Sequence, residues 1–259
     1  MNNYWANRIE RAQTALSNKS QKAIDRQLKK YYRRAAERVI ENFKDTYNQI
    51  LLQIESGKEP SPALLYKLDD YWKQQAALRH ELNKLGEKQI ALMTKEFELH
   101  YFDIYYSFSM EGIEPFNTID NAGVRQMIKS SWLSDGKTFS QRVWENTNRL
   151  VETLNDELIN CIATGAKTTK LKQLLQERFN VSYRRANTLA RTELAHIQTR
   201  AAEDRYKSYG IQFVEILVDV DSRTCEQCKE LVGKKFPINN APVLPLHPNE
   251  RCCLVPVID

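Results

Sequence analysis

Glycine and proline are scarce in this sequence, with eight of each among 259 residues. Both residues interrupt helices, so their scarcity favours a helix-rich fold. No apolar run approaches the ~20 residues that span a bilayer, and the N-terminal stretch lacks the apolar segment of a secretory signal. We therefore expect a globular protein that makes no membrane contact and is synthesised in a reducing cytoplasm.

Common enzyme motifs are also missing. The sequence has no glycine-rich loop that would cradle phosphate, no G-x-S-x-G turn and no H-E-x-x-H helix. A zinc deaminase would carry H-x-E followed by P-C-x-x-C. Here the C-x-x-C comes first, His247 follows it, and Glu250 lies three residues further on. These absences argue against the enzyme classes that such motifs define.

Positive charge is concentrated in residues 1–50, which hold 11 Lys and Arg against 5 Asp and Glu, a net of +6 where the whole chain carries +5. Within this segment, the stretch LKKYYRRAAER places four of these cations beside two tyrosines: Lys29, Lys30, Arg33 and Arg34. Such a cluster could neutralise the phosphates of double-stranded DNA. A solvated helix face explains it equally well. No base-reading motif accompanies the cluster, so any DNA contact should lack sequence preference.

Apolar residues spaced three or four apart predict long amphipathic helices in the first half of the chain. The pattern covers residues 4–16, resumes after the polar SNKS stretch over about 24–50, and returns over 78–104. The SGKEPSP stretch at 56–62 interrupts it with residues typical of a turn and a new helix start. We expect an N-terminal arm or hairpin of long helices over residues 1–110.

After a loop at 109–123, the second half of the chain is predicted to form a helical body. Gly210 is positioned to end its last helix, and the β-branched run 211–220 predicts a strand. The expected fold is mostly α: a long helical hairpin and helical body with a small, zinc-stabilised C-terminal β/loop module. The second domain is placed at 124–259, with a zinc knuckle at 211–259. The helices of this half are expected to begin near Ser140, Thr169 and Ser182, and the closing strand covers 252–259.

Four of the five cysteines lie near the C-terminus, in the pattern C-x2-C-x18-H-x4-C formed by Cys225, Cys228, His247 and Cys252. A C-x-x-C turn aims two thiolates the same way, and a second pair completes a tetrahedron around zinc. Four protein ligands would make the ion structural, and it would explain how a β segment with few apolar residues folds. The alternatives are reduced cysteines or a disulfide from Cys225 to Cys228 or Cys252. Cys253 is a substitute ligand, but adjacent strand residues face opposite sides, so only one of the last two cysteines should face the ion.

Two further groups could carry chemistry. The ARTELAH stretch holds Arg191, Glu193 and His196. Glu193 and His196 are three residues apart on a predicted helix and could form an acid/base pair or, more simply, a structural ion pair. Asp219 and Asp221 flank the C-x-x-C turn and could be carboxylate ligands, although turn formation explains them as well. We assign no catalytic residue.

Four stretches resemble the C-terminal domain of phage minor head proteins, the Mu F-like head morphogenesis family: SDGKTFSQRVWENTNRL, ARTELAHIQTRA, VDVDSRTCEQCKELVGKKF and PLHPNERC. The resemblance covers roughly residues 125–256. The family usually ends in H-P-N-C-R-C. Here Glu250 stands at the first of those cysteines and Cys252 matches the second, which leaves open whether Glu250, Cys253 or neither replaces the lost thiol.

The resemblance implies a low-copy capsid component that acts in procapsid assembly. Its implied partners are the portal protein, capsid or scaffold proteins, and packaged double-stranded DNA. Such a protein is made in the host cytoplasm and lies inside the head of the virion, where it is structural rather than enzymatic. The alternative is a zinc-containing nuclease or transferase-type enzyme whose site uses Glu193, His196 or Asp221. The N-terminal helices carry no motif of the family.

Overall fold

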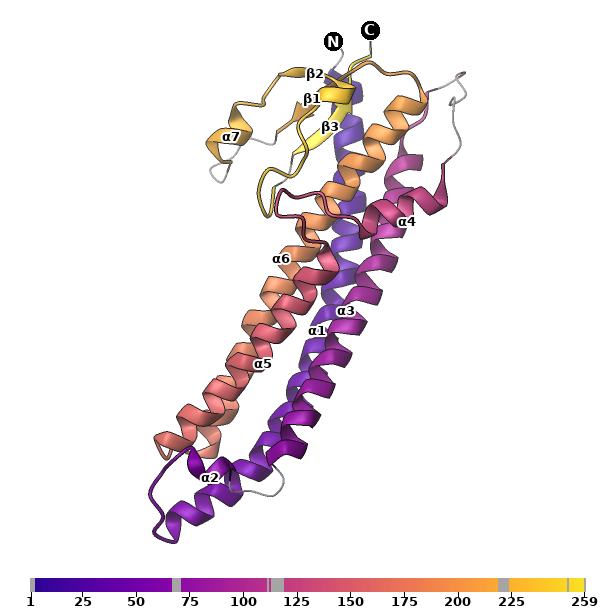
Figure 1. Ribbon diagram of the computed structural model, residues 1–259. Coiled ribbons are helices and arrows are strands. Elements are labelled where there is room, and N and C mark those ends of the chain that lie inside the picture. Colours follow the sequence, from indigo (N-terminus) through magenta and orange to yellow (C-terminus); the bar gives the residue numbers. More distant parts are fainter. Residues whose placement is uncertain are drawn as a thin grey trace. The chain divides into compact units, whose positions relative to one another are not determined.

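The fold is mostly α-helical, as predicted, with about 73% of the described residues in helices and a small C-terminal strand module. The computed structural model describes residues 3–66, 71–110, 112, 119–218, 224–250 and 252–258. In chain order, Figure 1 shows helices and strands α1 (Asn3–Glu55), α2 (Ala63–Tyr66), α3 (Tyr71–Ser107), α4 (Asn121–Lys129), α5 (Phe139–Ala163), α6 (Thr168–Ser208), β1 (Phe213–Leu217), α7 (Glu226–Lys229), β2 (Lys235–Pro237), a 3-10 turn (Ile238–Asn240) and β3 (Cys253–Pro256). Within the described residues, no helix combines the length and apolarity that crossing a membrane requires.

Helix α1 continues through the SNKS stretch, where the sequence predicts a break. That prediction is wrong because the serines of this stretch contact a neighbouring helix. Ser17 Oγ lies 3.4 Å from Nε2 of His100, and Ser20 Oγ lies 3.2 Å from Nδ1 of the same ring. No glycine or proline occurs before Gly57, so nothing in the backbone ends the helix earlier.

Helix α6 is also a single helix, although the sequence predicts two helices over this range. No glycine or proline lies between Gly165 and Gly210, and the polar residues around Ser182 do not stop the helix. Gly210 has a φ of +73°, a conformation that favours glycine, and it ends the segment as predicted. Helix α5 begins at Phe139, so the predicted cap Ser140 lies inside the first turn.

Two compact units make up the chain, and each is assembled from separate stretches of sequence. Helices α1, α3 and α6 each contribute to both units. The units therefore mix the predicted arm (1–110) with the predicted second domain (124–259), and those boundaries stay a prediction. Unit 1 comprises Met1–Asp25, Met93–Phe139 and Thr188–Asp259, and unit 2 comprises Arg26–Leu92 and Ser140–Asn187.

Unit 1 contains a three-stranded antiparallel sheet in the order β2–β1–β3. Val214 on β1 lies opposite Phe236 on β2 and opposite Pro256 on β3. The strands predicted at 211–220 and 252–259 are thus present. The expectation of a module with few apolar contacts is wrong, because the sheet places apolar side chains in the core of unit 1, each at most 1% exposed: Val214, Ile216, Leu254 and Val255.

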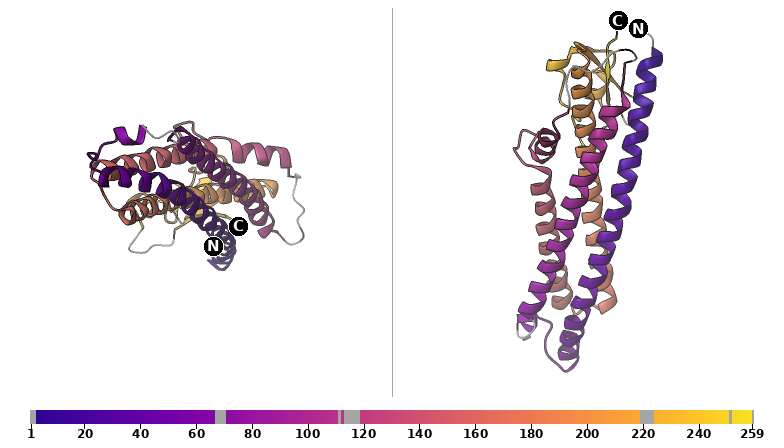
Figure 2. Two further views of the ribbon diagram at one scale, coloured as in Figure 1. Left: turned by 90° about the horizontal axis from the view of Figure 1, so that it is seen from below. Right: turned by 90° about the vertical axis from the view of Figure 1, so that its right-hand side faces the viewer.

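The side chain of Gln13, on α1, joins α1 to α6 and β3 within unit 1. Its Nε2 donates to the hydroxyl of Tyr206 (3.1 Å), and its Oε1 accepts from Nε2 of Gln198 (3.2 Å) and from the thiol of Cys253 (2.8 Å). Tyr206 donates in turn to the carbonyl of Leu254 (3.0 Å). Because Gln13 and Tyr206 are buried, loss of a partner would leave an unsatisfied polar group. Figures 1 and 2 both show this part of α1 beside β3.

Unit 2 packs parts of α1, α3, α5 and α6 alongside one another (Figure 2). The predicted apolar stripes of these helices face its core, with two exceptions. The spacing of three or four residues places Tyr31 and Ile90 in the core, but both are only partly buried, and their neighbours Tyr32 and Gln89 are buried instead. The predicted residues that are buried include Leu28, Val39, Phe43, Tyr47, Leu78, Leu82, Val143, Leu150 and Leu154.

Gly86 allows α3 to approach α5 closely. A Cβ atom at this position would lie 2.6 Å from ring carbon Cζ3 of Trp144, which is far inside van der Waals contact. Any larger residue must therefore displace the indole ring or separate the two helices.

We expect Gly86→Ala to lower the free energy of unfolding by about 1–3 kcal/mol, because the added methyl group overpacks the contact with Trp144. At an exposed helix position without such a neighbour, the same change would raise the free energy of unfolding by about 1 kcal/mol. Denaturant unfolding in two backgrounds measures the effect. When Trp144 is changed to Ala, Gly86→Ala should become neutral or stabilising; equal losses in both backgrounds would show that the contact is not the cause.

Candidate functional site

Three predicted zinc ligands converge in the C-terminal module. Cys225 caps α7 and its sulfur accepts the backbone N–H of Cys228 (3.4 Å), so the short helix aims both sulfurs to one side. Nε2 of His247 lies 3.1 Å from the Cys225 sulfur and 3.4 Å from the Cys228 sulfur. A tetrahedral zinc site separates its sulfur and nitrogen ligands by about 3.5 Å. These three atoms are therefore spaced much as ligands of one ion would be.

The second ring nitrogen of His247 supports the same interpretation. Nδ1 donates to the carbonyl of Pro248 (3.1 Å), so the proton of the neutral ring resides on Nδ1. The lone pair of Nε2 then faces the two sulfurs. Histidines that bind metals are commonly oriented by such a bond from the other nitrogen.

Cys252 belongs to a second group of donors, with Cys228 and Glu250. The ligand atoms of this group lie within 4.8 Å of one another, as do those of Cys225, Cys228 and His247. Cys253 does not join either group in the described residues, because its buried thiol donates to Gln13. Cys252 and Cys253 thus face different surroundings, as expected for neighbouring residues at the start of a strand. Asp219 and Asp221, the other proposed carboxylate ligands, lie outside the described residues.

Glu250 uses one carboxylate oxygen and leaves the other without a partner. Oε2 accepts the backbone N–H groups of Leu246 and His247, the latter at 3.3 Å. Oε1 is buried and has no hydrogen-bond partner. A buried carboxylate oxygen without a donor is costly, so a cation beside it would be stabilising.

The pKa values of the thiols fit a site that needs a cation. The backbone N–H of Cys228 lowers the pKa of Cys225. Burial raises the pKa of Cys228 to about 11. Burial and then the carboxylate of Glu250 raise the pKa of Cys252. Without a metal, Cys228 and Cys252 would stay protonated at neutral pH, whereas a bound ion would replace their protons. Three features of these residues therefore fit zinc: the types of donor, the spacing of the sulfur and nitrogen atoms, and the unpartnered oxygen of Glu250.

A cavity of about 670 Å³ adjoins this cluster within unit 1. Its walls come from α1, α6 and the loop that carries His247, and they include Glu10, Arg191, Glu250 and Cys252. The cluster is therefore open to water on this side.

Glu193 and His196 contact Trp132 and the loop at Leu244. The indole N–H of Trp132 donates to Oε2 of Glu193 (2.8 Å), and the same indole stacks on the His196 ring with centroids 4.2 Å apart. Nδ1 of His196 donates to the carbonyl of Leu244 (3.0 Å). Both side chains are buried, and together they attach Trp132 and the loop at Leu244 to α6. This arrangement gives the pair a structural role.

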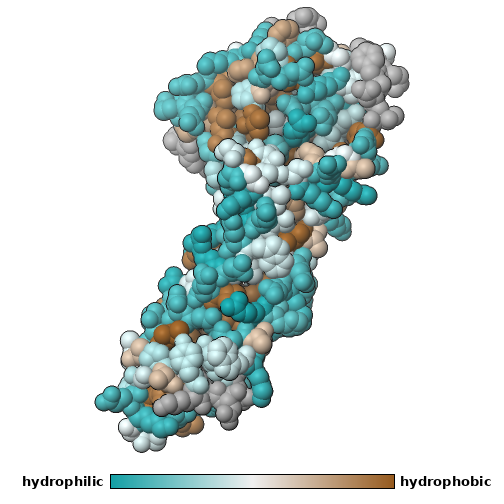
Figure 3. All heavy atoms as spheres, in the orientation of Figure 1, coloured by the Kyte–Doolittle hydropathy of each residue, from teal (hydrophilic) through white to brown (hydrophobic). Residues whose placement is uncertain are grey.

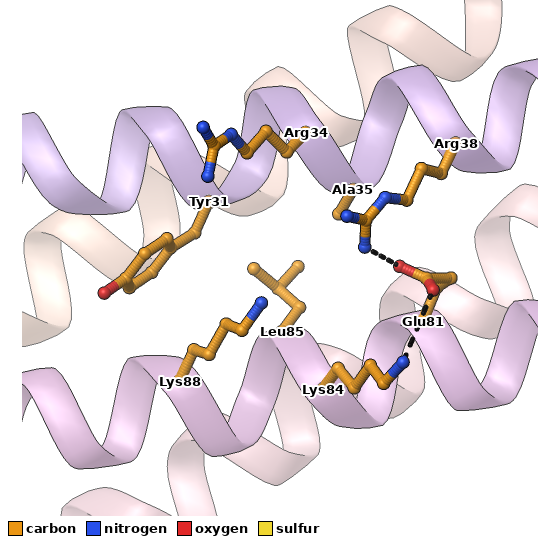
Figure 4. Close-up of a pocket in the computed structure, with 8 residues that line it drawn as sticks. All are labelled: Tyr31, Arg34, Ala35, Arg38, Glu81, Lys84, Leu85 and Lys88. Atoms are coloured by element: carbon orange, nitrogen blue, oxygen red, sulfur yellow. Dashed lines mark hydrogen bonds and ion pairs between the residues drawn. The ribbon is translucent and has the colours of Figure 1, made fainter.

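The predicted basic cluster lies on α1 in unit 2, where Lys29, Lys30, Arg33 and Arg34 are all exposed. Arg33 lies 3.7 Å from Glu37 one turn later. Only Arg34 of the four lines a groove between α1 and α3, shown in Figure 4.

The groove gathers three cations that sequence reasoning missed: Arg38, Lys84 and Lys88. The carboxylate of Glu81 lies 2.9 Å from Arg38 and 4.0 Å from Lys84, while Arg34 and Lys88 lie further along the groove (Figure 4), so the groove holds four cations and one anion. Arg34 and Arg38 are four residues apart, as are Lys84 and Lys88, so the sequence indicates that each pair shares one helix face. Nothing in the sequence shows that the two helices pack together at these positions. At about 60 Å³ the groove is far smaller than a small-molecule pocket and suits a surface phosphate group.

A family model described as phage Mu protein F like protein matches residues 152–254. This is a family of phage head morphogenesis proteins, so the resemblance is confirmed over this range. The matched range holds the R-T-E stretch and all five donors of the cluster, from Cys225 to Cys252. Residues 125–151, where the resemblance in sequence begins, lie outside it. No curated protein and no solved structure matches the chain.

Stability should depend on pH through His196. Burial lowers the pKa of this ring to about 4, from an unfolded value near 6.5. The unfolded chain then binds the proton more readily, so the stabilisation is complete above pH 6.5 and is lost as the pH falls toward 4. We expect wild type to lose about 2–3 kcal/mol more than His196→Asn between pH 7 and pH 4.

Denaturant unfolding at a series of pH values measures this difference. Asn is the chosen substitution because its side-chain N–H can still reach the Leu244 carbonyl. His80→Asn is the matched control, because His80 is exposed on α3. Parallel pH profiles for wild type and His196→Asn would contradict the assignment.

Proposed function

We propose that this chain is a structural component of a phage head, present in few copies, that acts in procapsid assembly. The observation that carries the proposal is the match of residues 152–254 to a family of phage head morphogenesis proteins. The contacts of Glu193 and His196 with Trp132 and Leu244 support it, since these are two of the three side chains proposed for an enzyme site. The head interior is accordingly the proposed location.

Mass spectrometry of purified procapsids and virions from the phage that encodes the chain tests this proposal. We expect peptides of the chain in both particles, at a small copy number relative to the major capsid protein. Absence from both particles would overturn the proposal. Cleavage of linear or supercoiled DNA by the purified chain, abolished by Glu193→Ala, would favour the nuclease alternative instead.

The portal protein, or a capsid or scaffold protein, is the proposed partner. Exposed apolar side chains on the C-terminal module support a protein contact, and Figure 3 shows hydrophobic atoms gathered on this part of unit 1. They include Phe213 (50% exposed), Val232 (50%) and Val243 (59%). Pull-down from cells that co-express the portal should compare wild type with Phe213→Asp and Val243→Asp. Deleting residues 1–110 would be a poor test, because Gln13 and His100 belong to the core of unit 1.

The C-terminal module is further proposed to hold structural zinc through Cys225, Cys228, His247 and Cys252. The support is the spacing of the sulfur and nitrogen atoms, the tautomer of His247 and the absence of a disulfide among the described cysteines. The buried strands β1 and β3 mean that zinc would order the loops rather than replace a core.

We expect the purified chain to contain zinc and Cys228→Ser to lose it. Zinc should raise the free energy of unfolding by about 3 kcal/mol at a free concentration 100-fold above Kd, and chelation should remove that increment. Elemental analysis and denaturant unfolding measure both effects. Cys161→Ser, a change in unit 2, is the control for zinc content. A metal-free wild type as stable as its zinc-treated form would overturn the zinc site.

Double-stranded DNA is the proposed ligand of the basic groove in unit 2. Support comes from the excess of cations over Glu81 and from the small volume, which admits a phosphate but no cofactor. Contacts of this kind are made to phosphates, so binding should be independent of sequence.

Replacing Arg34, Lys84 and Lys88 by Ala should weaken DNA binding and reduce its logarithmic salt dependence by about 1 per cation removed. Fluorescence anisotropy over a salt series measures this. Lys167→Ala with Lys172→Ala is the control, since both residues are exposed elsewhere in unit 2. An equal effect of the two sets of changes would mean that the groove has no special role.

A further inference from the structure

The five donors of the C-terminal module form two groups that share one sulfur. One group joins Cys228 to Cys225 and His247, and the other joins Cys228 to Glu250 and Cys252. In each group the ligand atoms lie within 4.8 Å of one another. A structural zinc ion takes four ligands. Five converging donors are therefore one more than a single ion uses.

The second group is prepared for a cation independently of the first. Both backbone N–H groups that reach Glu250 bind Oε2, which fixes the orientation of the carboxylate. Oε1 then points into the protein, buried and without a hydrogen-bond partner. In metal sites, hydrogen bonds from surrounding groups commonly orient a ligating carboxylate. The backbone N–H groups of Leu246 and His247 bind Oε2 in this way and leave Oε1 available to an ion.

Charge also favours more than one ion. With Cys225, Cys228 and Cys252 as thiolates and Glu250 as carboxylate, the donors carry −4, while His247 is neutral. One divalent ion leaves −2 on a cluster whose shared member, Cys228, is only 3% exposed. Two divalent ions bring the cluster to neutrality. Uncompensated charge at a buried position is strongly destabilising, so the neutral arrangement is the more stable one.

We propose that the C-terminal module binds a second zinc-type ion through Cys228, Glu250 and Cys252, with the thiolate of Cys228 shared between the two ions. When both ions are bound, Cys252 belongs to the second ion and the first keeps Cys225, Cys228 and His247. This inference rests on the zinc centre of the proposed function. Two sulfurs and one carboxylate oxygen suit zinc better than magnesium or calcium, which prefer oxygen ligands alone. The adjoining cavity of about 670 Å³, lined by Glu250 and Cys252, gives water access to positions that the protein leaves open.

Zinc stoichiometry at saturation tests the second ion. Chain equilibrated with excess zinc, then freed of unbound metal, should hold two zinc ions per chain in wild type and one in Glu250→Gln. Gln keeps a carbonyl oxygen for the backbone N–H groups of Leu246 and His247, so the loop should stay folded. Glu230→Gln is the matched control: this exposed glutamate follows α7, and the variant should still hold two ions.

Each other outcome is decisive. One zinc ion in wild type overturns the second ion and leaves the zinc centre of the proposed function intact, whether or not Glu250→Gln retains it. No zinc in any variant overturns both. Two ions in wild type and two in Glu250→Gln would overturn the role of Glu250.

Cobalt substitution tests the shared sulfur. In wild type, the electron paramagnetic resonance signal should grow to one equivalent of Co²⁺ and then weaken, because a bridging thiolate couples the two spins. In Glu250→Gln it should saturate at one equivalent without weakening. A wild-type signal that grows linearly to two equivalents would show two separate sites and overturn the sharing of Cys228.

Discussion

The hydrogen bonds of Gln13 hold the first turns of α1 to the C-terminal module, and unit 1 depends on them. Cys253 donates into this buried network, while its neighbour Cys252 faces Cys228 and Glu250. Cys252, the last metal-ligand candidate in the sequence, thus directly precedes β3. The first residue of that strand, Cys253, is held in the protein core. Buried polar networks specify one arrangement when every member is satisfied, and become costly when one member is removed. The position of the donor cluster therefore has its origin in packing and hydrogen bonding.

The two units carry different chemistry. Unit 1 holds the sulfur, imidazole and carboxylate donors together with exposed apolar side chains, which suits a module that is ordered by metal and contacts a protein. Unit 2 holds a helix-lined groove with four cations and one carboxylate, which suits a phosphate backbone. Glu193 and His196, the proposed acid/base pair, belong to neither site and contact Trp132 and Leu244. The two sites therefore suit two different kinds of contact, one in each unit.

Local patterns in the sequence predicted the features that depend on local physics. The 3.6-residue spacing identified the core faces of α1, α3 and α5, Gly210 marked the end of α6, and the C-x-x-C turn placed two sulfurs together. Features that depend on distant residues were missed. The predicted helix break at SNKS is wrong because Ser17 and Ser20 contact His100. No local pattern reveals a contact between residues so far apart in the sequence. The groove was found only in part, since Arg38 and Lys84 meet through helix pairing, and the free oxygen of Glu250 becomes visible only when the loop fold is known.

The interleaving of the units has a consequence for biosynthesis. Residues 3–25 leave the ribosome well before residues 188–258, which supply their partners in unit 1. At 5–20 residues per second the delay is roughly 10–30 s. During that time the nascent chain exposes the apolar side of its first helix. Closing the long loop also costs conformational entropy, which the contacts within unit 1 offset only after the loop has closed. This protein is therefore expected to complete its folding late in translation and to benefit from chaperones that shield emerging helices.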